Sequence, residues 1–489
     1  MTENVAITKI DEVNVKVHCS NSLAKDITEI YTFMVPGYQH MPKFKAGFWD
    51  GKIRLFSFYK RLLPTGLAPD LRTRLLNEGY NVTYDPDLEP VKVDVSLVAE
   101  FLRSQSLKFK PRDYQLKALL YALREKRCLL VSPTASGKSL IIHLLAQWYK
   151  DQQILIVVPK IDLVNQMTKD FMDYDLSGMA GKEIQKIVGG ETKDVSKRVV
   201  ISTWQSIWKL EPNWFEDFGV VIGDECHRFK ANCLKEIMDK LQNTKYRYGL
   251  TGTLDQTETN EMVLRGQFGA VNIVTTTKEL TDRKEVAKLH IKSLVLSYPP
   301  EVIKSLAPKG KRKWDYNTEI EFLFGYEPRN KFIRKLALTR TGNTLIIFKR
   351  VEHGKALHER LLKDSLNPVY LVHGKVDSDE REDIRQIVNT HRTSITLATD
   401  KCFSEGINIP NLNNIIFAAP SKSRINVLQS IGRVLRKTEI KDFCRLYDIC
   451  DDLTFRSWKN YSLEHYLERA RMYEMEHHDN QQIDVGIIK

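Results

Sequence analysis

Residues 132–139 (SPTASGKS) have the types and spacing of a phosphate-binding loop, between an apolar stretch at 128–131 and another at 140–145. Backbone N–H groups of such a loop surround the phosphates, Lys138 reaches the β- and γ-phosphates, and Ser139 binds Mg²⁺. The strict pattern begins with Gly where this chain has Ser132, so a chance Gly-Lys-Ser at a helix start is the alternative. The residues expected to hold the nucleotide are Pro133, Thr134, Ala135, Ser136, Gly137, Lys138 and Ser139.

Two adjacent carboxylates at the end of an apolar strand supply the second part of this chemistry. Residues 220–227 (VVIGDECH) place Asp224 and Glu225 where the strand ends and the chain turns, so both side chains can reach one site. Asp224 can hold Mg²⁺ through its water shell, and Glu225 can position and deprotonate an attacking water. A pair of acids at a helix N-terminus is the alternative. With the phosphate-binding loop, the pair predicts ATP hydrolysis, with ATP and Mg²⁺ as cofactors.

A pair of arginines in residues 429–436 (QSIGRVLR) is the third part. Arg433 and Arg436 are three residues apart and share one face of a helix. Such a pair can stabilise the charge that develops on the γ-phosphate, as an arginine finger does. A solvated basic helix face is the alternative.

The composition limits what kind of protein carries these motifs. Of 489 residues, 42% are apolar and 28% charged, which suits globular domains. No apolar run reaches the length of a membrane span, and the N-terminus lacks the pattern of a secretion signal, so we expect no membrane contact. The seven cysteines lack metal-ligand spacing, which favours reduced thiols in the cytoplasm. The formal net charge of +12 favours a polyanionic partner such as nucleic acid.

Short apolar stretches alternate with amphipathic ones from about residue 110 onward, which indicates parallel α/β sheets. The expected strands form one series at 128–132, 154–159, 199–202, 220–223 and 248–250, and a second at 344–348, 370–373, 395–398, 415–418 and 444–449. The predicted fold class is therefore α/β, with two tandem parallel-sheet domains behind a small α/β N-terminal domain. We place the domains at 1–105, 106–300 and 301–489, the last with a basic linker at its start and a helical tail.

The N-terminal region contains a basic and aromatic stretch that could bind nucleic acid. Lysine and arginine neutralise phosphates, and aromatic rings can stack on exposed bases. We expect phosphate contacts from Lys43, Lys45, Lys52 and Arg54, whereas Trp49 and Phe56 are expected to pack the core of the small domain. The dipeptide Asp50-Gly51 predicts the turn of a hairpin over residues 48–56. The basic segment 309–314 (KGKRKW) is a second candidate for duplex contact or strand splitting, with a solvated linker as the alternative.

The order of SPTASGKS, DECH, LTGT at 250–253 and QSIGRVLR resembles motifs I, II, III and VI of superfamily 2 helicases. This resemblance implies two RecA-like domains with ATP between them, and coupling of hydrolysis to domain movement by Thr251 and Thr253. Residues 112–115 (RDYQ) look like the adenine-reading motif, which implies that Gln115 contacts the base. The resemblance also implies nucleotide contacts from Gly406 and Gln429. At position 408 this chain has Asn where the family usually has Asp.

Further segments resemble the motifs with which these helicases hold a nucleic-acid backbone: VVPK at 157–160, STWQS at 202–206, IIFKR at 346–350, VHG at 372–374 and ATD at 398–400. The side chains implied to face the nucleic acid are Lys160, Thr203, Trp204, Gln205, Lys349, His373 and Thr399.

Residues 47–55 (GFWDGKIRL) and 61–66 (RLLPTG) resemble the first domain of the recombination helicases of T-even bacteriophages. This resemblance implies a monomeric DNA helicase that unwinds Holliday junctions, displacement loops, R-loops and forks during phage replication, recombination and repair. The implied partners are branched, single-stranded or double-stranded DNA, RNA within R-loops, and a single-strand DNA-binding protein. An RNA helicase and an ATP-switched DNA-binding motor subunit of a restriction or repair assembly are the alternatives.

Overall fold

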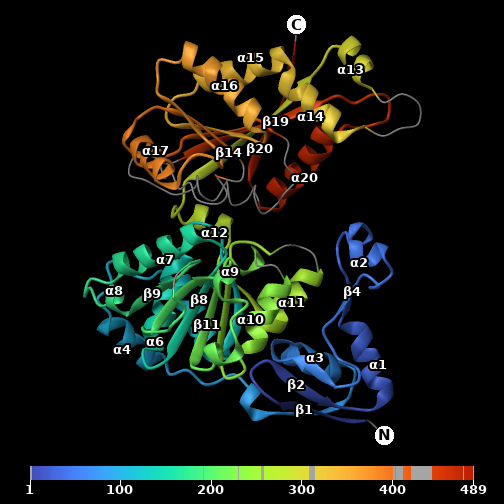
Figure 1. Cartoon of the computed structure of the whole chain (residues 1–489), viewed down its shortest axis with the longest axis vertical. Coiled ribbons are helices and arrows are strands. Elements are labelled where there is room, and N and C mark those ends of the chain that lie inside the picture. The colour runs from blue at the N-terminus through green and yellow to red at the C-terminus, as the bar shows by residue number, and fades with distance from the viewer. Residues whose placement is uncertain are drawn as a thin grey trace. The chain divides into compact units, whose positions relative to one another are not determined.

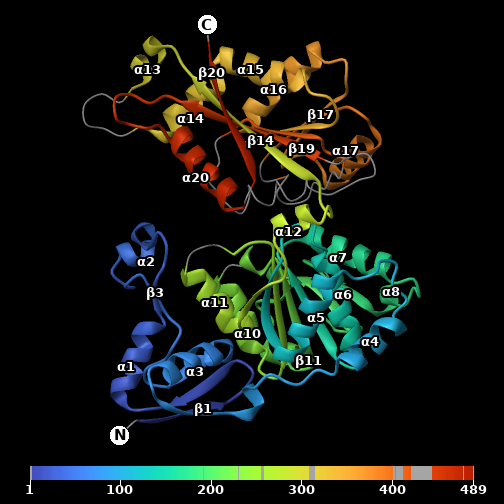
Figure 2. The same ribbon diagram turned by 180° about the vertical axis from the view of Figure 1, so that it is seen from behind.

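The computed structural model describes residues 3–190, 192–228, 231–254, 258–307, 314–399, 402, 411–419, 443–476 and 478–487. Contacts among them divide the chain into two compact units, Met1–Thr275 and Thr276–Lys489 (Figures 1 and 2). Within the described ranges, no helix is both long and apolar enough to cross a membrane.

The first unit begins with a small α/β domain whose four-stranded sheet has the order β5-β2-β1-β6. Its elements are β1 (Asn4–Lys9), β2 (Asn14–His18), α1 (Asn21–Ile30), β3 (Thr32–Met34), η1 (Tyr38–His40), α2 (Pro42–Lys45), β4 (Lys52–Arg54), β5 (Leu62–Pro64), η2 (Thr65–Leu67), α3 (Ala68–Asn77), β6 (Asn81–Tyr84) and η3 (Pro86–Leu88). Alternate residues of β1 and β2, among them Val5, Ile7, Val15 and Val17, point into one core with α1 and α3.

The predicted hairpin over residues 48–56 is wrong. Strand β4 follows the Asp50-Gly51 turn, but it pairs antiparallel with β3, so Ile53 lies opposite Phe33. The residues between β3 and β4 instead form η1 and α2. This segment, residues 32–54, is called the arm, and it stands away from the four-stranded sheet at the blue end of the chain (Figures 1 and 2).

A seven-stranded parallel sheet with the order β13-β7-β12-β11-β8-β10-β9 forms the rest of the first unit. Its elements are α4 (Val95–Ser104), α5 (Asp113–Glu125), β7 (Arg127–Val131), α6 (Lys138–Trp148), β8 (Gln153–Val158), α7 (Ile161–Tyr174), α8 (Ala180–Glu183), β9 (Ile184–Ile187), β10 (Val199–Thr203), α9 (Trp204–Ile207), η4 (Pro212–Phe215), β11 (Phe218–Asp224), η5 (Cys226–Arg228), α10 (Ala231–Lys240), β12 (Tyr246–Thr251), α11 (Glu258–Phe268) and β13 (Val271–Ile273).

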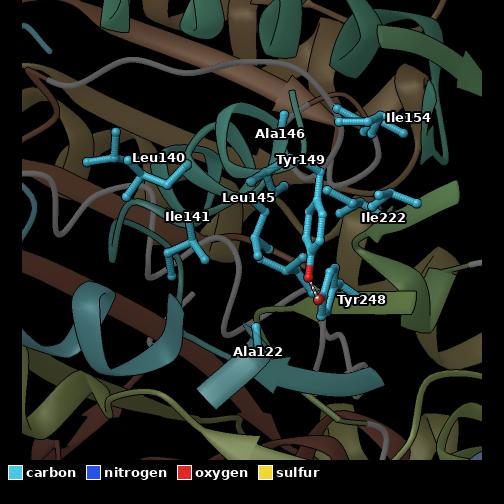
Figure 3. Packing of buried hydrophobic residues seen from close by; sticks show 14 of the residues in the cluster. Ala122, Leu140, Ile141, Leu145, Ala146, Tyr149, Ile154, Ile222 and Tyr248 are labelled. Atoms are coloured by element: carbon cyan, nitrogen blue, oxygen red, sulfur yellow. Dashed lines mark hydrogen bonds between the residues drawn. The ribbon is translucent and has the colours of Figure 1, made fainter. Parts of the chain in front are cut away.

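Both faces of this sheet are covered, which explains why its strands are continuous apolar runs. Ile154 and Ile156 of β8 pack on one face with α5, α6 and α7, while Leu155 and Val157 pack on the other with α9, α10 and α11. The hydroxyls of Tyr149 and Tyr248 form a hydrogen bond of 2.7 Å inside the core that α5, α6 and α7 cover (Figure 3).

The second unit contains another seven-stranded parallel sheet, with the order β16-β17-β15-β18-β19-β14-β20 among the described residues. Its elements are α12 (Thr277–Asp282), β14 (Lys288–Ser297), α13 (Pro300–Leu306), α14 (Tyr316–Gly325), α15 (Glu327–Leu338), β15 (Thr344–Phe348), α16 (Val351–Asp364), β16 (Val369–Val372), α17 (Ser378–Thr390), β17 (Ile395–Thr399), β18 (Asn414–Phe417), β19 (Phe443–Asp452), α20 (Tyr461–Met475) and β20 (Asp479–Gly486). The predicted fold class, two tandem parallel-sheet domains behind a small α/β domain, is confirmed.

The division of the chain differs from the expected boundaries at both points. Helix α4 packs Val98 against the core of the first parallel sheet, so the N-terminal domain ends before residue 105. Strand β14 lies between β19 and β20 in the second sheet, so the second unit begins before residue 300. The tail contains the expected helix, α20, but also the strand β20.

The small domain is fixed to the parallel sheet by charged and backbone contacts. Asp70 of α3 accepts a hydrogen bond from Arg265 of α11 at 2.9 Å. Arg127, at the start of β7, donates to both the carboxylate and the backbone carbonyl of Glu12. Gly66 lies so close to α11 that a Cβ atom there would overlap the carbonyl oxygens of Arg265 and Gly266. The small domain, which carries the arm, and the first parallel sheet therefore belong to one unit.

We predict that Gly66→Ala loosens this docking, because backbone atoms cannot give way as a flexible side chain does. Overpacking of this kind costs about 1–3 kcal/mol, and the midpoint of thermal unfolding of the full chain should fall by several degrees. Gly189→Ala is the matched control, since a Cβ there meets nothing within 4 Å. Equal midpoints for the two variants would show that the close approach at Gly66 is unimportant.

Candidate ATP and nucleic-acid sites

The phosphate-binding loop connects β7 to α6 and has left-handed backbone at Ala135 (φ 72°) and Gly137 (φ 78°). Two features favour Gly at position 137: its φ is positive, and a Cβ atom there would overlap Nε2 of Gln115. Ser132, which replaces the expected Gly, is buried and donates its hydroxyl to Ser136 Oγ at 2.6 Å. Ser136 Oγ in turn donates to the carbonyl of Pro133 at 2.7 Å. Ser132, where the strict pattern has Gly, thus stabilises the loop through its hydrogen bond to Ser136.

Gln115 holds this loop through both ends of its side-chain amide. Its Nε2 donates to the carbonyls of Ser136 and Gly137 at 3.0 and 3.2 Å, and its Oε1 accepts from the N–H of Arg112 at 2.8 Å. Tyr114 Oη also donates to the Ser136 carbonyl, at 2.9 Å. The 112–115 motif therefore contacts the loop itself, a role that the implied adenine contact of Gln115 did not include.

Lys138 lies between the loop and the acidic pair. Its Nζ donates to the carbonyl of Ser132 at 3.1 Å and lies 3.5 Å from Oε1 of Glu225. Ser139, the next residue, places its hydroxyl 2.6 Å from that of Tyr174 at the end of α7. Sequence reasoning missed Tyr174, because nothing in its local pattern signals a contact with a residue so distant in the chain.

Asp224 and Glu225 stand where β11 ends, and Glu225 has a left-handed backbone (φ 49°). This turn brings the Glu225 carboxylate to Lys138. Burial, and then the negative charge of Glu225, raises the pKa of Asp224 to about 7. Burial alone would also raise the pKa of Glu225, but the positive charge of Lys138, followed by His227 and Arg228, holds it well below its usual range. The pair thus combines one carboxylate that is firmly ionised with one that titrates near neutrality.

The residues around Asp224 fit a magnesium ion with its water shell. Asp224 Oδ1 is buried and accepts no hydrogen bond from any residue that the structure describes. A buried carboxylate oxygen of this kind is normally satisfied by a donor, a water or a cation. Oxygen ligands from carboxylates, hydroxyls and phosphates are those that Mg²⁺ prefers, and Ser139 offers the hydroxyl.

Thr251 and Thr253 are linked to both parts of this site. The N–H of Ser132 donates to the Thr251 carbonyl at 2.9 Å, and Thr251 Oγ1 hydrogen-bonds with His227 Nδ1 and donates to the Thr253 carbonyl. Gly252 N–H reaches Glu225 Oε2 at 3.5 Å. The segment between β12 and α11 therefore contacts the loop and the carboxylate pair, and α11 then meets the N-terminal domain.

The expected nucleic-acid residues of the first unit follow two neighbouring strands. Thr203 of β10 is in register with Val158 of β8, so Lys160 and Thr203 leave the same edge of the sheet. Gln205 Nε2 donates to the Pro159 carbonyl at 3.2 Å, which joins the two segments. The ring of Trp204 packs against the apolar cluster beneath it.

Three candidates of the second unit also gather at one sheet edge. Lys349 follows β15, His373 follows β16 and Thr399 ends β17, and these strands are adjacent with Phe348 opposite Thr399. Lys349 is exposed and Thr399 is largely buried. Gly406, Asn408, Gln429, Arg433 and Arg436 lie outside the described residues.

The basic and aromatic residues of the N-terminal domain divide into two groups. Phe56 is 1% exposed in the core, as expected, whereas Phe48 and Tyr59 are 87% and 93% exposed. Trp49 is half-buried and donates its indole N–H to the Lys52 carbonyl. Arg54 pairs with Asp50, but none of Lys43, Lys45 and Lys52 forms an ion pair with a described carboxylate. The arm thus carries three exposed lysines that pair with none of the described carboxylates.

The proposed role of the 309–314 segment loses its aromatic part. Trp314 is 6% exposed and packs in the core of the second unit, so it is not available to separate strands. Its neighbours Lys309, Lys311, Arg312 and Lys313 lie outside the described residues.

Comparisons with known proteins identify the family. Residues 4–85 match the N-terminal domain of the DNA helicase UvsW, 108–256 the res subunit of type III restriction enzymes, and 328–438 the conserved C-terminal helicase domain. The ATP-dependent DNA helicase UvsW of Enterobacteria phage T4 is 35% identical over 95% of this chain and 96% of its own. The DNA 3'-5' translocase XPB2 of Sulfurisphaera tokodaii is 26% identical over 68% of this chain and 80% of its own.

Solved structures agree with this result. The crystal structure of T4 UvsW matches 99% of this chain and 100% of its own with 33% identity and a TM-score of 0.52. A fragment of an HsdR subunit of a type I restriction enzyme from Vibrio vulnificus, 17% identical, matches 79% of this chain and 70% of its own with a TM-score of 0.58, which shows a shared fold. The chain therefore belongs to the UvsW family of superfamily 2 helicases, and it is an ATP-hydrolysing DNA helicase.

Proposed function

We propose that this helicase unwinds or branch-migrates branched DNA, namely Holliday junctions, displacement loops, R-loops and forks, in phage replication, recombination and repair. The observation that carries this proposal is the N-terminal domain, which matches that of UvsW and presents the lysines of the arm to solvent. The residues at the sheet edges would hold the backbone of any strand. The lysines of the arm form a second basic surface, which belongs to the first unit. This surface would bind a further DNA duplex, which only branched DNA provides.

The geometry around Lys138 supports our proposal for the ATP site. The loop residues from Pro133 to Ser139 would bind the phosphates, and Mg²⁺, held by Ser139 and Asp224, would neutralise charge on the β- and γ-phosphates. Because the pKa of Glu225 lies well below neutrality, its carboxylate is ionised and can accept a proton from the attacking water. Thr251 and Thr253 would couple ATP hydrolysis to movement of α11. Arg433 and Arg436 would supply the positive charge for the γ-phosphate, and Gly406 and Gln429 further contacts to the nucleotide.

For nucleic acid, we assign Lys160, Thr203 and Gln205 of the first unit and Lys349, His373 and Thr399 of the second to the strand backbone. Trp204 would contact the strand through the part of its ring that the apolar cluster leaves exposed. Lys43, Lys45, Lys52 and Arg54 would hold the branch. We further propose that the chain acts as a monomer in the host cytoplasm, with RNA in R-loops and a single-strand DNA-binding protein as additional partners.

A second candidate is an ATP-switched, DNA-binding motor subunit of a restriction or repair assembly. The match of residues 108–256 to a restriction-enzyme subunit favours it. Such a subunit would use ATP to change shape and leave strand processing to its partners. Strand displacement by the isolated chain separates the two candidates.

Glu225→Gln should keep DNA binding but lower the steady-state rate of ATP hydrolysis by about 100-fold or more, the usual contribution of a general base. Lys138→Ala should likewise abolish turnover, because the phosphates lose their cation. Glu216→Gln, an exposed change in the same domain, is the control and should hydrolyse ATP normally. Near-normal turnover by Glu225→Gln would refute its assignment as the base.

Asp224→Asn should stabilise the nucleotide-free protein at high pH. The pKa of Asp224 is raised from 3.8 to about 7, so the folded state binds more protons than the unfolded chain between these values and stability falls as pH rises through them. The amide removes this loss, which is at most about 4 kcal/mol. Thermal unfolding in EDTA should show little difference between variant and wild type at pH 4 and a higher midpoint for the variant at pH 8. A pH-independent difference, or a shift shared by exposed Asp217→Asn, would contradict the buried-carboxylate assignment.

The branch preference is tested by the rate of ATP hydrolysis at fixed salt with a Holliday junction, a fork, linear duplex, single-stranded DNA and RNA. We expect the branched DNAs to stimulate hydrolysis most. The same panel with Lys43, Lys45 and Lys52 changed to Ala should lose this preference but keep stimulation by single-stranded DNA. Equal stimulation by linear duplex would remove the branched-DNA proposal, and preference for RNA would favour an RNA helicase.

A further inference from the structure

Three aromatic side chains of the second unit meet beside Lys349, and they are called the aromatic cluster: Tyr316, Tyr461 and His465. The rings of Tyr316 and Tyr461 meet edge to face with centroids 5.5 Å apart, and His465 lies 6.0 Å from Tyr316 and 6.3 Å from Tyr461. All three side chains are half-buried. The three residues are therefore partly accessible to solvent, and Tyr461 also packs against the core of the second unit.

A buried carboxylate positions the cluster. Glu319, in the first turn of α14, accepts hydrogen bonds from Asn460 Nδ2 and the backbone N–H groups of Tyr461 and Ser462 at 2.7–2.8 Å. A carboxylate is favourable at the N-terminus of a helix, where backbone N–H groups lack partners. Because Glu319 and Tyr316 share the first turn of α14, this bond network fixes the start of α20 against Tyr316. The spacing of the rings is thus set by the fold.

Lys349 connects the cluster to the sheet edge where His373 and Thr399 also lie. Its Nζ donates to Tyr316 Oη at 2.6 Å and lies 5.1 Å from the centre of the Tyr316 ring. Two of the nearby acids are engaged, since Asp315 caps α14 and Glu321 pairs with Arg350 at 3.5 Å. Trp458, three residues before Tyr461 in the chain, is 41% exposed. The Lys349 side chain thus contacts Tyr316 and is exposed to solvent.

We propose that the aromatic cluster stacks on one base of single-stranded DNA while Lys349 holds the adjoining phosphate. Aromatic rings beside a cation are the combination that binds single strands without sequence preference, because every base has a π-face. The site would make the second unit grip bases as well as backbone. This inference rests on the proposed action on DNA, and it adds base contact to the backbone contact expected of Lys349.

The test compares a thymidine oligonucleotide with an abasic strand of the same length, both at one fixed salt concentration. Tyr316→Leu and Tyr461→Leu should each weaken binding of the base-bearing strand by about 5- to 100-fold, the contribution of one stacked base. Binding of the abasic strand should change little. Tyr316→Phe keeps the ring and loses only the hydroxyl bond to Lys349, so it should retain the preference for bases. Tyr370→Leu, a half-buried tyrosine of the same unit that stacks on His391, is the matched control.

An equal loss on both strands, or the same loss in Tyr370→Leu, would overturn the stacking site. Stimulation of ATP hydrolysis by single-stranded DNA is measured in parallel on the wild type. If DNA stimulates hydrolysis but both leucine variants bind as the wild type does, the stacking site falls and the proposed function stands. If DNA does not stimulate the wild type, the proposed function falls first.

Discussion

The rest of the structure depends on the placement of two adjacent carboxylates at the end of β11, where Asp224 is buried and Glu225 is largely buried. Two negative charges in a largely buried site are unfavourable, and Lys138, 3.5 Å from Glu225, is the first of the positive groups that offset one of them, followed by His227 and Arg228. The raised pKa of Asp224 is the consequence. Holding this arrangement requires the left-handed turn at Glu225, the loop that carries Lys138, and the segment after β12 that reaches both. Parallel strands β7, β12 and β11, which are neighbours in the sheet, supply all three at one sheet edge.

The connection from this site to the N-terminal domain is short. Helix α11 begins a few residues after Thr251 and Thr253, and its Arg265 binds Asp70, which also accepts from Tyr31 and Arg74. Thr259, in the first turn of α11, donates to the Met34 carbonyl at the base of the arm. A rearrangement of the segment after β12 would therefore reach the arm through one helix. We propose that the ATP site is coupled to the arm through these packed contacts, all of which lie within the first unit.

The sequence predicted the parts of the fold that depend on local pattern. Fully buried strands are continuous apolar runs, so every expected strand from 128 to 250 has a counterpart, and the loop and carboxylate motifs lie where strands end. Long-range pairing was not visible. Strand β4 pairs with β3, and η1 and α2 lie between them in the chain. The Asp50-Gly51 signal indicates a turn but does not show which strand pairs with β4. Strand β20 was missed because it lies at a sheet edge and is mostly polar. Tyr174 and Glu319 act on residues distant in the chain, so no local signal marks them.

The most direct measurement of the account is strand displacement from a fluorescently labelled fork by the purified chain alone, with ATP and with a non-hydrolysable analogue. We predict displacement with ATP and none with the analogue, because we propose that ATP hydrolysis, with Glu225 as the base, drives movement of the enzyme along DNA. No displacement with ATP, despite DNA-stimulated hydrolysis, would contradict unwinding by this chain and favour the motor-subunit alternative. Equal displacement with the analogue would show that nucleotide binding is sufficient to separate the strands and that ATP hydrolysis is not required.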